Sequence, residues 1–300
     1  MELWIPITIA AAFCQNLRSA LQKHLQGSLG TRGASFVRFG YGFPLAVIYV
    51  LVLHFGVGYA LPSPDLEFVF WVVLGGLAQI FATMLLVYLF SLRNFAVGTA
   101  YSKTEPVQAA IFGFIILGDK LTTGGIVAII VGVIGVMLIS MANLPLSWRN
   151  LGTAMVGRIA LIGMASGGLF AIASISFRSA SLSLNGPNSI MQAAVTLTCV
   201  TIFQTVFMLI WMLWKDKREI VQVVRTWRSS ALVGLAGVVG SACWFTAMTL
   251  QQVAYVKALG QIELIFTFAS SYFLFHERLN RMELSGCLLI VCGILGLLMS

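Results

Sequence analysis

Charge is scarce in this chain of 300 residues, since only 9% are Asp, Glu, Lys or Arg while 59% are hydrophobic. Soluble domains carry about 25% charged and 45–50% apolar residues. With a mean hydropathy of +0.95, a soluble fold would leave large apolar areas in contact with water. The composition therefore excludes a disordered or disulfide-rich chain and predicts a polytopic membrane protein.

Residues for metal, nucleotide or nucleic-acid chemistry are also few. The five cysteines lie in apolar runs and lack CxxC spacing, so we expect small core residues. The three histidines are far apart, which excludes an HExxH zinc site. The net charge of +8 comes from single charges between apolar runs, so nucleic-acid binding is excluded. No GxxxxGK[ST] motif is present, and we expect no cofactor and no enzymatic activity.

Apolar runs dominate what is present. A helix crosses a bilayer with about 20 residues, and ten such runs begin near Leu3, Ala34, Glu67, Phe95, Gly124, Ala154, Ser189, Ser229, Val253 and Glu283. We therefore predict an all-α integral membrane protein with ten transmembrane helices, located in the plasma (inner) membrane. The basic stretch at 215–228 is partly amphipathic and is expected to lie on the membrane surface.

A shift of 158 residues aligns the two halves of the chain. It places Glu105 on Glu263, and Asp119-Lys120-Leu121 on Glu277-Arg278-Leu279. Residues 1–146 and 147–300 then form two repeats of five spans each. An odd number of spans gives the repeats opposite orientations, so the sequence predicts two inverted five-helix repeats.

The matching segments resemble the drug/metabolite transporter superfamily, in particular its ten-helix EamA-type branch. The resembling runs are SLRNFAVGTAYSKTEPVQAAIFGFIILGDKL and TLQQVAYVKALGQIELIFTFASSYFLFHERL. In two places the second run departs from the pattern, with Leu264 opposite Pro106 and His276 opposite Gly118. The resemblance implies translocation by alternating access, through a central cavity lined by both halves.

Polar side chains near the middle of apolar spans mark the expected cavity, because a charge there costs about 2.5–3.5 kcal/mol on insertion scales. In the first span, Gln15, Arg18 and Gln22 share one face at helical spacing. The other interpretation of this face is a buried structural network, or charges that snorkel outward.

The fourth and ninth spans, matched by the repeat, also carry ionisable groups. Tyr101, Glu105 and Gln108 form one stripe, and Lys103 belongs to another. In the ninth span, Lys257 and Gln261 are predicted to share a face while Glu263 lies on a different one. Glu105 is expected to pair with a cation of another helix, Arg18 or Arg38. An interhelical salt bridge that only holds the fold is an equally open interpretation of both glutamates.

The full set of candidate substrate-binding residues adds weaker positions in other spans. It comprises Gln15, Arg18, Gln22, Arg38, Tyr41, Gln79, Tyr101, Lys103, Glu105, Gln108, Trp244, Lys257, Gln261 and Glu263. Glycines at 132, 135, 286 and 293 are predicted to let the fifth and tenth spans approach closely. The resemblance gives these two helices a role in packing at the bundle edge or in a homodimer.

Orientation follows from loop charge. Loops after odd-numbered spans hold eleven Lys and Arg residues, and those after even-numbered spans hold two, Lys120 and Arg178, which predicts both termini outside the cytoplasm. The resemblance implies the reverse orientation, so the two lines of inference disagree.

Taken together, these features favour a secondary transporter for a small polar organic metabolite, amino-acid-like or anionic. A proton is a candidate coupling ion, carried on Glu105 or Glu263. The alternatives are a receptor or scaffold that transports nothing, and a membrane-embedded enzyme that uses Glu105 and Glu263.

Overall fold

Helices make up every regular element of the described chain. The computed structural model describes residues 2–92, 102, 104–120, 122–141, 158–186, 188–215, 217–266 and 281–298, and among these no β-strand occurs. The elements are α1 (Trp4–Leu25), α2 (Thr31–Gly40), α3 (Phe43–Leu51), the π-helical turn η1 (Val52–Gly56), α4 (Leu66–Leu92), α6 (Glu105–Leu117), α7 (Thr123–Met141), α9 (Arg158–Ser183), α10 (Ser189–Lys215), α11 (Lys217–Arg225), α12 (Trp227–Leu250), α13 (Val253–Leu259), the 3₁₀ turn η2 (Gly260–Ile262) and α15 (Arg281–Leu298).

Five helical segments are long and apolar enough to cross a membrane. They are Thr31–Gly56, Leu66–Leu89, Leu161–Ser183, Ser189–Lys215 and Trp227–Leu250, each of 23 to 27 residues. Helix α1 has the length, but its run of Gln, Asn, Arg and Ser side chains makes it too polar for the same criterion. The prediction of a multi-pass, all-helical protein is confirmed, and the number of ten spans remains a prediction.

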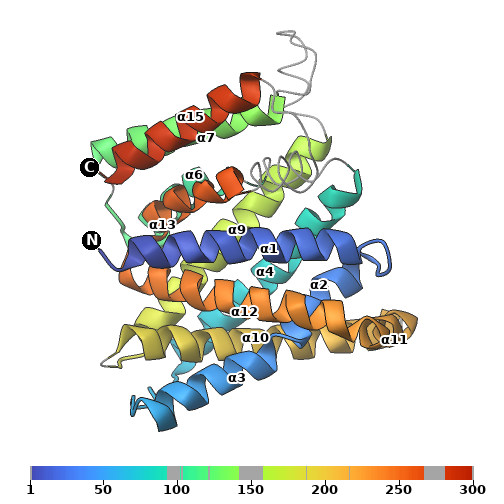
Figure 1. Cartoon of the computed structure of the whole chain (residues 1–300). Coiled ribbons are helices and arrows are strands. Elements are labelled where there is room, and N and C mark those ends of the chain that lie inside the picture. The colour runs from blue at the N-terminus through green and yellow to red at the C-terminus, as the bar shows by residue number, and fades with distance from the viewer. Residues whose placement is uncertain are drawn as a thin grey trace.

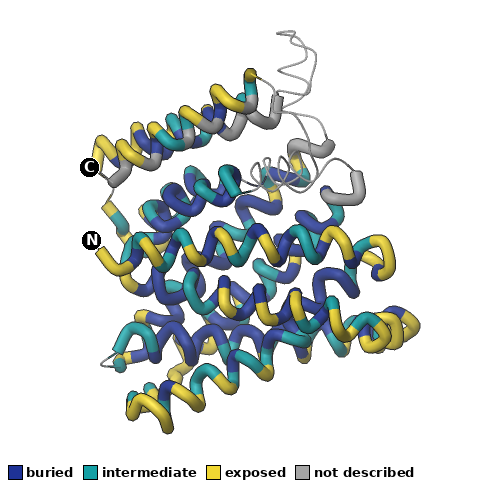
Figure 2. The backbone as a smooth tube through the Cα atoms, in the orientation of Figure 1, coloured by how far each residue is buried: buried dark blue, intermediate teal, exposed yellow. Residues whose placement is uncertain are grey.

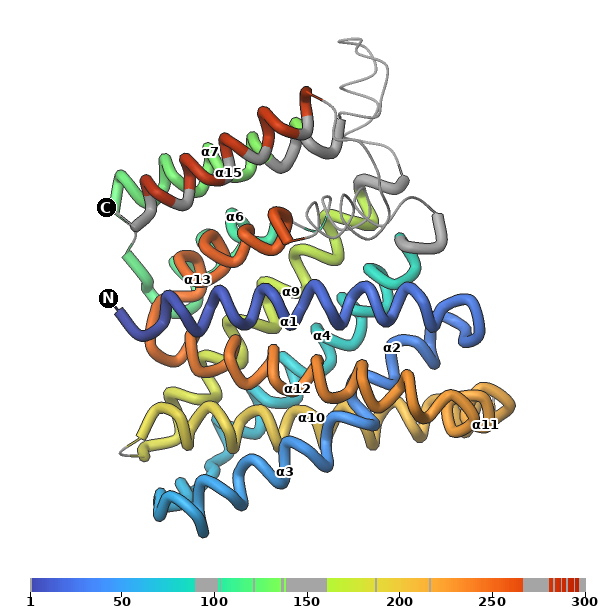
Figure 3. The backbone as a smooth tube through the Cα atoms, viewed as in Figure 1, coloured from blue at the N-terminus to red at the C-terminus, as the bar shows by residue number. Residues whose placement is uncertain are grey.

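The most extensive helix contacts join α7 to α15, α4 to α9, and α1 to α12. The 158-residue shift carries α1 onto α9, α4 onto α12 and α7 onto α15. The α1–α12 and α4–α9 contacts are therefore equivalent contacts in the two halves, and the α7–α15 contact joins a helix of one half to its counterpart in the other. In Figure 3, α1 and α9 run in opposite directions across the bundle, as an inverted repeat requires.

The outer faces of the bundle are apolar. Large hydrophobic side chains such as Phe55, Phe70, Ile115 and Ile210 are exposed there, whereas the buried residues include many Ser, Thr and Gln side chains. Figure 2 places the buried backbone between α1, α9, α10 and α12, and exposed residues along α3 and α15. Such a surface suits lipid acyl chains, while polar groups find partners inside the bundle.

A short helix, α11, links α10 to α12 at one end of the bundle (Figure 1). It is amphipathic, and its Glu219 and Val223 are buried against neighbouring helices. The backbone N–H of Gly33 donates to Glu219 Oε1 at 2.7 Å, and a Cβ on Gly30 would lie 2.5 Å from the same oxygen. The expected amphipathic segment is thus a helix, and glycine lets α2 approach its carboxylate.

Four free cysteines are described, and two of them, Cys199 and Cys243, pack against the hydrophobic core as expected. Cys14, Cys199 and Cys243 are half-buried, and Cys292 is exposed. The prediction is wrong for Cys292 because α15 lies at the edge of the bundle, where one of its faces is open.

The close approach of α7 and α15 is confirmed by Gly293. A Cβ on Gly293 would lie 2.9 Å from the Ala128 carbonyl oxygen and 2.9 Å from the Gly132 nitrogen, both backbone atoms that cannot move aside alone. One helix turn away, a Cβ on Gly296 would meet only the Ala128 methyl group, at 3.8 Å.

We expect Gly293→Ala to force these helices apart and to lower the free energy of unfolding by about 1–3 kcal/mol. Gly296→Ala is the matched control and should change that free energy by less than about 0.5 kcal/mol. Unfolding titrations in mixed detergent micelles measure both variants. Equal losses of stability would contradict the packing described for Gly293.

Candidate functional site

A small cavity lies inside the bundle, between helices of both halves. Its volume is about 30 Å³. Eight of the fourteen predicted residues line it, namely Gln15, Arg18, Arg38, Gln79, Glu105, Trp244, Lys257 and Glu263. The cavity therefore brings together charged groups that are far apart in the sequence, from α1, α2, α6 and α13, and Glu263, which directly follows η2.

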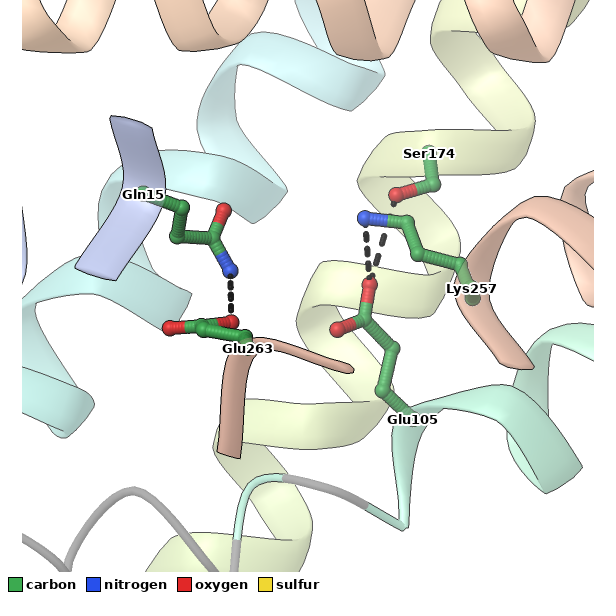
Figure 4. Close-up of polar contacts among 5 residues, drawn as sticks. All are labelled: Gln15, Glu105, Ser174, Lys257 and Glu263. Carbon is green, nitrogen blue, oxygen red and sulfur yellow. Dashed lines mark hydrogen bonds and ion pairs between the residues drawn. The ribbon is translucent and has the colours of Figure 1, made fainter. Parts of the chain in front are cut away.

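Glu105, at the start of α6, pairs with Lys257 of α13. The Lys257 Nζ lies 2.8 Å from Glu105 Oε1, and the Ser174 hydroxyl donates to the same oxygen at 3.5 Å (Figure 4). The Lys257 ammonium also lies 4.5 Å from the centre of the Trp244 ring, a cation–π contact. The expectation that Arg18 or Arg38 pairs with Glu105 is wrong.

A change of helix type explains why Lys257 and Glu263 reach the same cavity. Helix α13 ends at Leu259, and η2 continues the chain as one 3₁₀ turn. A 3₁₀ turn rotates the chain by about 120° per residue instead of about 100°, so three residues rotate Glu263 about 60° toward the face of Lys257. The prediction of separate faces is therefore wrong, and Gln261 instead lies against Gly132 of α7.

Glu263 occupies the matching position in the second half and has a different partner. Gln15 Nε2 of α1 donates to Glu263 Oε2 at 2.8 Å (Figure 4). Arg18 lies close enough for its charge to act on Glu263. Ser174 and Gln15 occupy nearly equivalent positions under the 158-residue shift, so each glutamate accepts a hydrogen bond from the first helix of the opposite half.

The two arginines are almost fully buried, with Arg18 3% and Arg38 5% exposed. Arg38 donates to the hydroxyls of Thr83 at 3.2 Å and Ser241 at 3.5 Å, and the 158-residue shift places Thr83 on Ser241. Arg18 donates to the Ser19 hydroxyl at 3.4 Å. The cavity thus holds three cationic and two anionic side chains among its lining residues.

Two buried donors of the cavity make no hydrogen bond within the described structure. They are Nε of Arg18 and Nε1 of Trp244. An unsatisfied buried donor is unfavourable by about 1–3 kcal/mol. Spare N–H groups and a surplus of positive charge suit an anionic group, such as a carboxylate, that accepts these hydrogen bonds.

The remaining predicted residues lie elsewhere. Gln22 donates to the Ala34 carbonyl at 2.8 Å, the Tyr41 hydroxyl donates to the Val223 carbonyl at 3.2 Å, and Gln108 donates to Thr104 Oγ1 at 2.9 Å. These three side chains have partners within the fold and do not line the cavity. Tyr101 and Lys103 lie outside the described residues.

Nine further lining residues were not singled out from the sequence. They are Ser19, Leu86, Ser102, Phe170, Ser174, Phe177, Ser241, Phe245 and Met248. Serine and aromatic residues are common in membrane helices, so their presence alone carries little information. The 158-residue shift is the one sequence signal that could have drawn attention to Ser241, through Thr83. Within the described residues, no three His, Cys, Asp or Glu side chains come together as metal ligands.

Near one end of the bundle, the Arg178 side chain of α9 caps the carbonyl groups at the C-terminal end of α12. It donates to the carbonyl oxygens of Met248, at 2.8 Å, and of Gln251. This position within α9 corrects the expectation that Arg178 lies in a loop. Asp119 lies nearby in the loop after α6, where partial burial raises the pKa of its carboxyl and the Arg178 charge opposes that rise.

Comparisons with known proteins agree with this architecture. One solved structure, titled "Crystal structure of protein", matches 98% of this chain and 98% of its own chain, with a TM-score of 0.69 and 13% identity. At that identity the likeness concerns the fold alone. No curated protein gives a significant sequence match.

The family comparison covers nearly the whole sequence. The EamA-like transporter family matches residues 2–141 and, a second time, residues 157–299. Each match lies within one of the two halves that the 158-residue shift relates. Because the family matches nearly the whole chain, this bundle of apolar helices around a charged cavity belongs to the EamA-like transporter family.

Proposed function

We propose that this multi-pass membrane protein is a secondary transporter that carries a small polar organic metabolite by alternating access. The proposal includes ten transmembrane helices in two inverted repeats, residues 1–146 and 147–300, with the solute bound in the central cavity. One observation carries it: charged side chains of both halves meet in one cavity inside an otherwise apolar bundle. Intramembrane charges are costly and generally mark a transport pathway.

The charges of the cavity support an amino-acid-like or anionic solute. Arg18, Arg38 and Lys257 outnumber Glu105 and Glu263, and the unpaired buried atoms of this cavity are N–H donors. A carboxylate would supply the acceptors that these groups lack, and Arg binds it through two parallel hydrogen bonds. An ammonium group on the same solute could replace Lys257 as the partner of Glu105.

The size of the cavity supports alternating access. A volume of about 30 Å³ holds about two water molecules, so a metabolite fits only after the surrounding helices separate. Repeats that rock about a fixed central site would open it to each side in turn. Release of the Glu105–Lys257 pair by the solute, or by a proton on Glu105, would favour that separation.

A receptor or scaffold would need no charges in the cavity, and an enzyme would need a nucleophile or a metal set beside its carboxylates. The discriminating experiment uses the purified protein in two steps. A thermal-shift screen against a metabolite panel should identify zwitterionic or anionic solutes that raise the melting temperature. Those solutes should then enter proteoliposomes faster than protein-free liposomes. Binding without flux would favour the receptor, and conversion of the solute would favour the enzyme.

A further inference from the structure

A second, larger cavity lies at one end of the bundle, where α1 ends and α12 begins. Its volume is about 420 Å³. One wall is formed by His24 in the last turn of α1 and by Ser28 just after that helix. The other wall is formed by Arg225, Trp227, Arg228 and Ser229 at the junction of α11 and α12. It shares no lining residue with the central cavity, so the proposed function leaves it unexplained.

The lining is basic and contains no carboxylate. Arg225 and Arg228 are exposed, and no ion pair joins either of them to another described residue. The Arg228 guanidinium lies 5.6 Å from the centre of the Trp227 ring, which restrains it at the cavity wall. Two guanidinium groups, with serine hydroxyls beside them, match the oxygens of a phosphate group.

The surroundings place this cavity at the depth of lipid headgroups. Trp214 and Trp227, at the two ends of the α11 segment, are 80% and 56% exposed. Val221 and Val224 of the amphipathic α11 are exposed as well. Tryptophan is enriched at the membrane–water interface, and amphipathic helices lie in that plane. Phospholipid headgroups carry a phosphate at this depth, and those with a net negative charge attract clustered Lys and Arg side chains.

We propose that this cavity binds the phosphate of an anionic phospholipid, held by Arg225 and Arg228 between α1 and α12. These two helices form one of the most extensive packed pairs of the bundle and carry Arg18, Ser241 and Trp244 of the central cavity. A lipid bound there would join the ends of α1 and α12.

The test measures binding of short-chain phosphatidylglycerol to the purified protein in detergent by native mass spectrometry. We expect Arg225→Gln/Arg228→Gln to weaken this binding at least tenfold. Lys217→Gln/Arg218→Gln removes two exposed charges of α11 outside the cavity, and it should stay within twofold of the wild type. Ser28→Asp, which places a carboxylate in the cavity wall, should weaken binding as the first variant does.

Three results would overturn the proposal. Equal losses in both double variants would mean diffuse attraction to a basic surface. Equal binding of phosphatidylcholine of the same chain length would mean that the anionic charge is not recognised. Displacement of phosphatidylglycerol by an equal concentration of inorganic phosphate would make the cavity a site for free phosphate. None of these measurements depends on transport, so the proposal can fail while the proposed function stands.

Discussion

Glu105→Gln is expected to reduce solute transport at least about 100-fold while the protein remains folded in the membrane. The substitution keeps the size of the side chain, and the amide oxygen can still accept a hydrogen bond from Lys257, 2.8 Å from the carboxylate. What is lost is the negative charge, which can bind a cationic group of the solute or a proton. Uptake into proteoliposomes measures transport, and the melting temperature reports the fold.

The control for this prediction is Glu67→Gln, which removes a carboxylate from an exposed residue near the start of α4 and should leave uptake unchanged. A purely structural salt bridge predicts a different pattern. In that case Glu105→Gln lowers the stability of the protein, and Lys257→Met restores both stability and uptake in the double variant. That recovery would contradict a transport role for Glu105.

Arg18→Ala is expected to weaken binding of an anionic solute at least about 30-fold, because loss of one partner of a buried charge pair costs about 2–5 kcal/mol. Arg18→Lys should weaken it by about tenfold, since a point charge replaces the two-pronged guanidinium. Analogues that lack the acidic group should bind the Ala variant and the wild type equally. Thermal shifts with the solute and its neutral analogue measure these differences.

A merely structural arginine would behave differently. Arg18 lies close to Glu263, so neutralisation of that glutamate is the competing role. If it is the only role, Arg18→Ala with Glu263→Ala recovers much of the binding lost in the single variant. Arg218→Lys, at an exposed position of α11, is the matched control and should leave binding unchanged.

Much of the fold could be predicted from the length of the apolar runs and from the 158-residue shift that aligns the two halves. Both features reflect the physics of the bilayer, which requires long apolar helices with satisfied backbone groups. The same shift paired Glu105 with Glu263, and both carboxylates lie in the central cavity. Mid-span charges were therefore a sound guide to the position of the cavity.

The partners of those charges could not be predicted. Helical spacing assumes a regular α-helix, whereas η2 changes the rotation of the chain between Lys257 and Glu263. Polar residues such as Gln22 and Tyr41 point to a cavity from the sequence, yet in the fold they donate to the backbone carbonyls of Ala34 and Val223. Which acceptor a buried amide or phenol reaches depends on packing between helices distant in sequence.

Solute counterflow in proteoliposomes tests the central claim most directly, because a carrier that alternates between two sides exchanges solute while a receptor or an enzyme does not. Liposomes are loaded with an unlabelled solute from the thermal-shift screen and diluted into a trace of the labelled solute. The account predicts that the label transiently accumulates inside above its equilibrium level with the wild-type protein and does not with Glu105→Gln. Accumulation that is absent for the wild type, or is unchanged in Glu105→Gln, would contradict transport through the Glu105–Lys257 cavity.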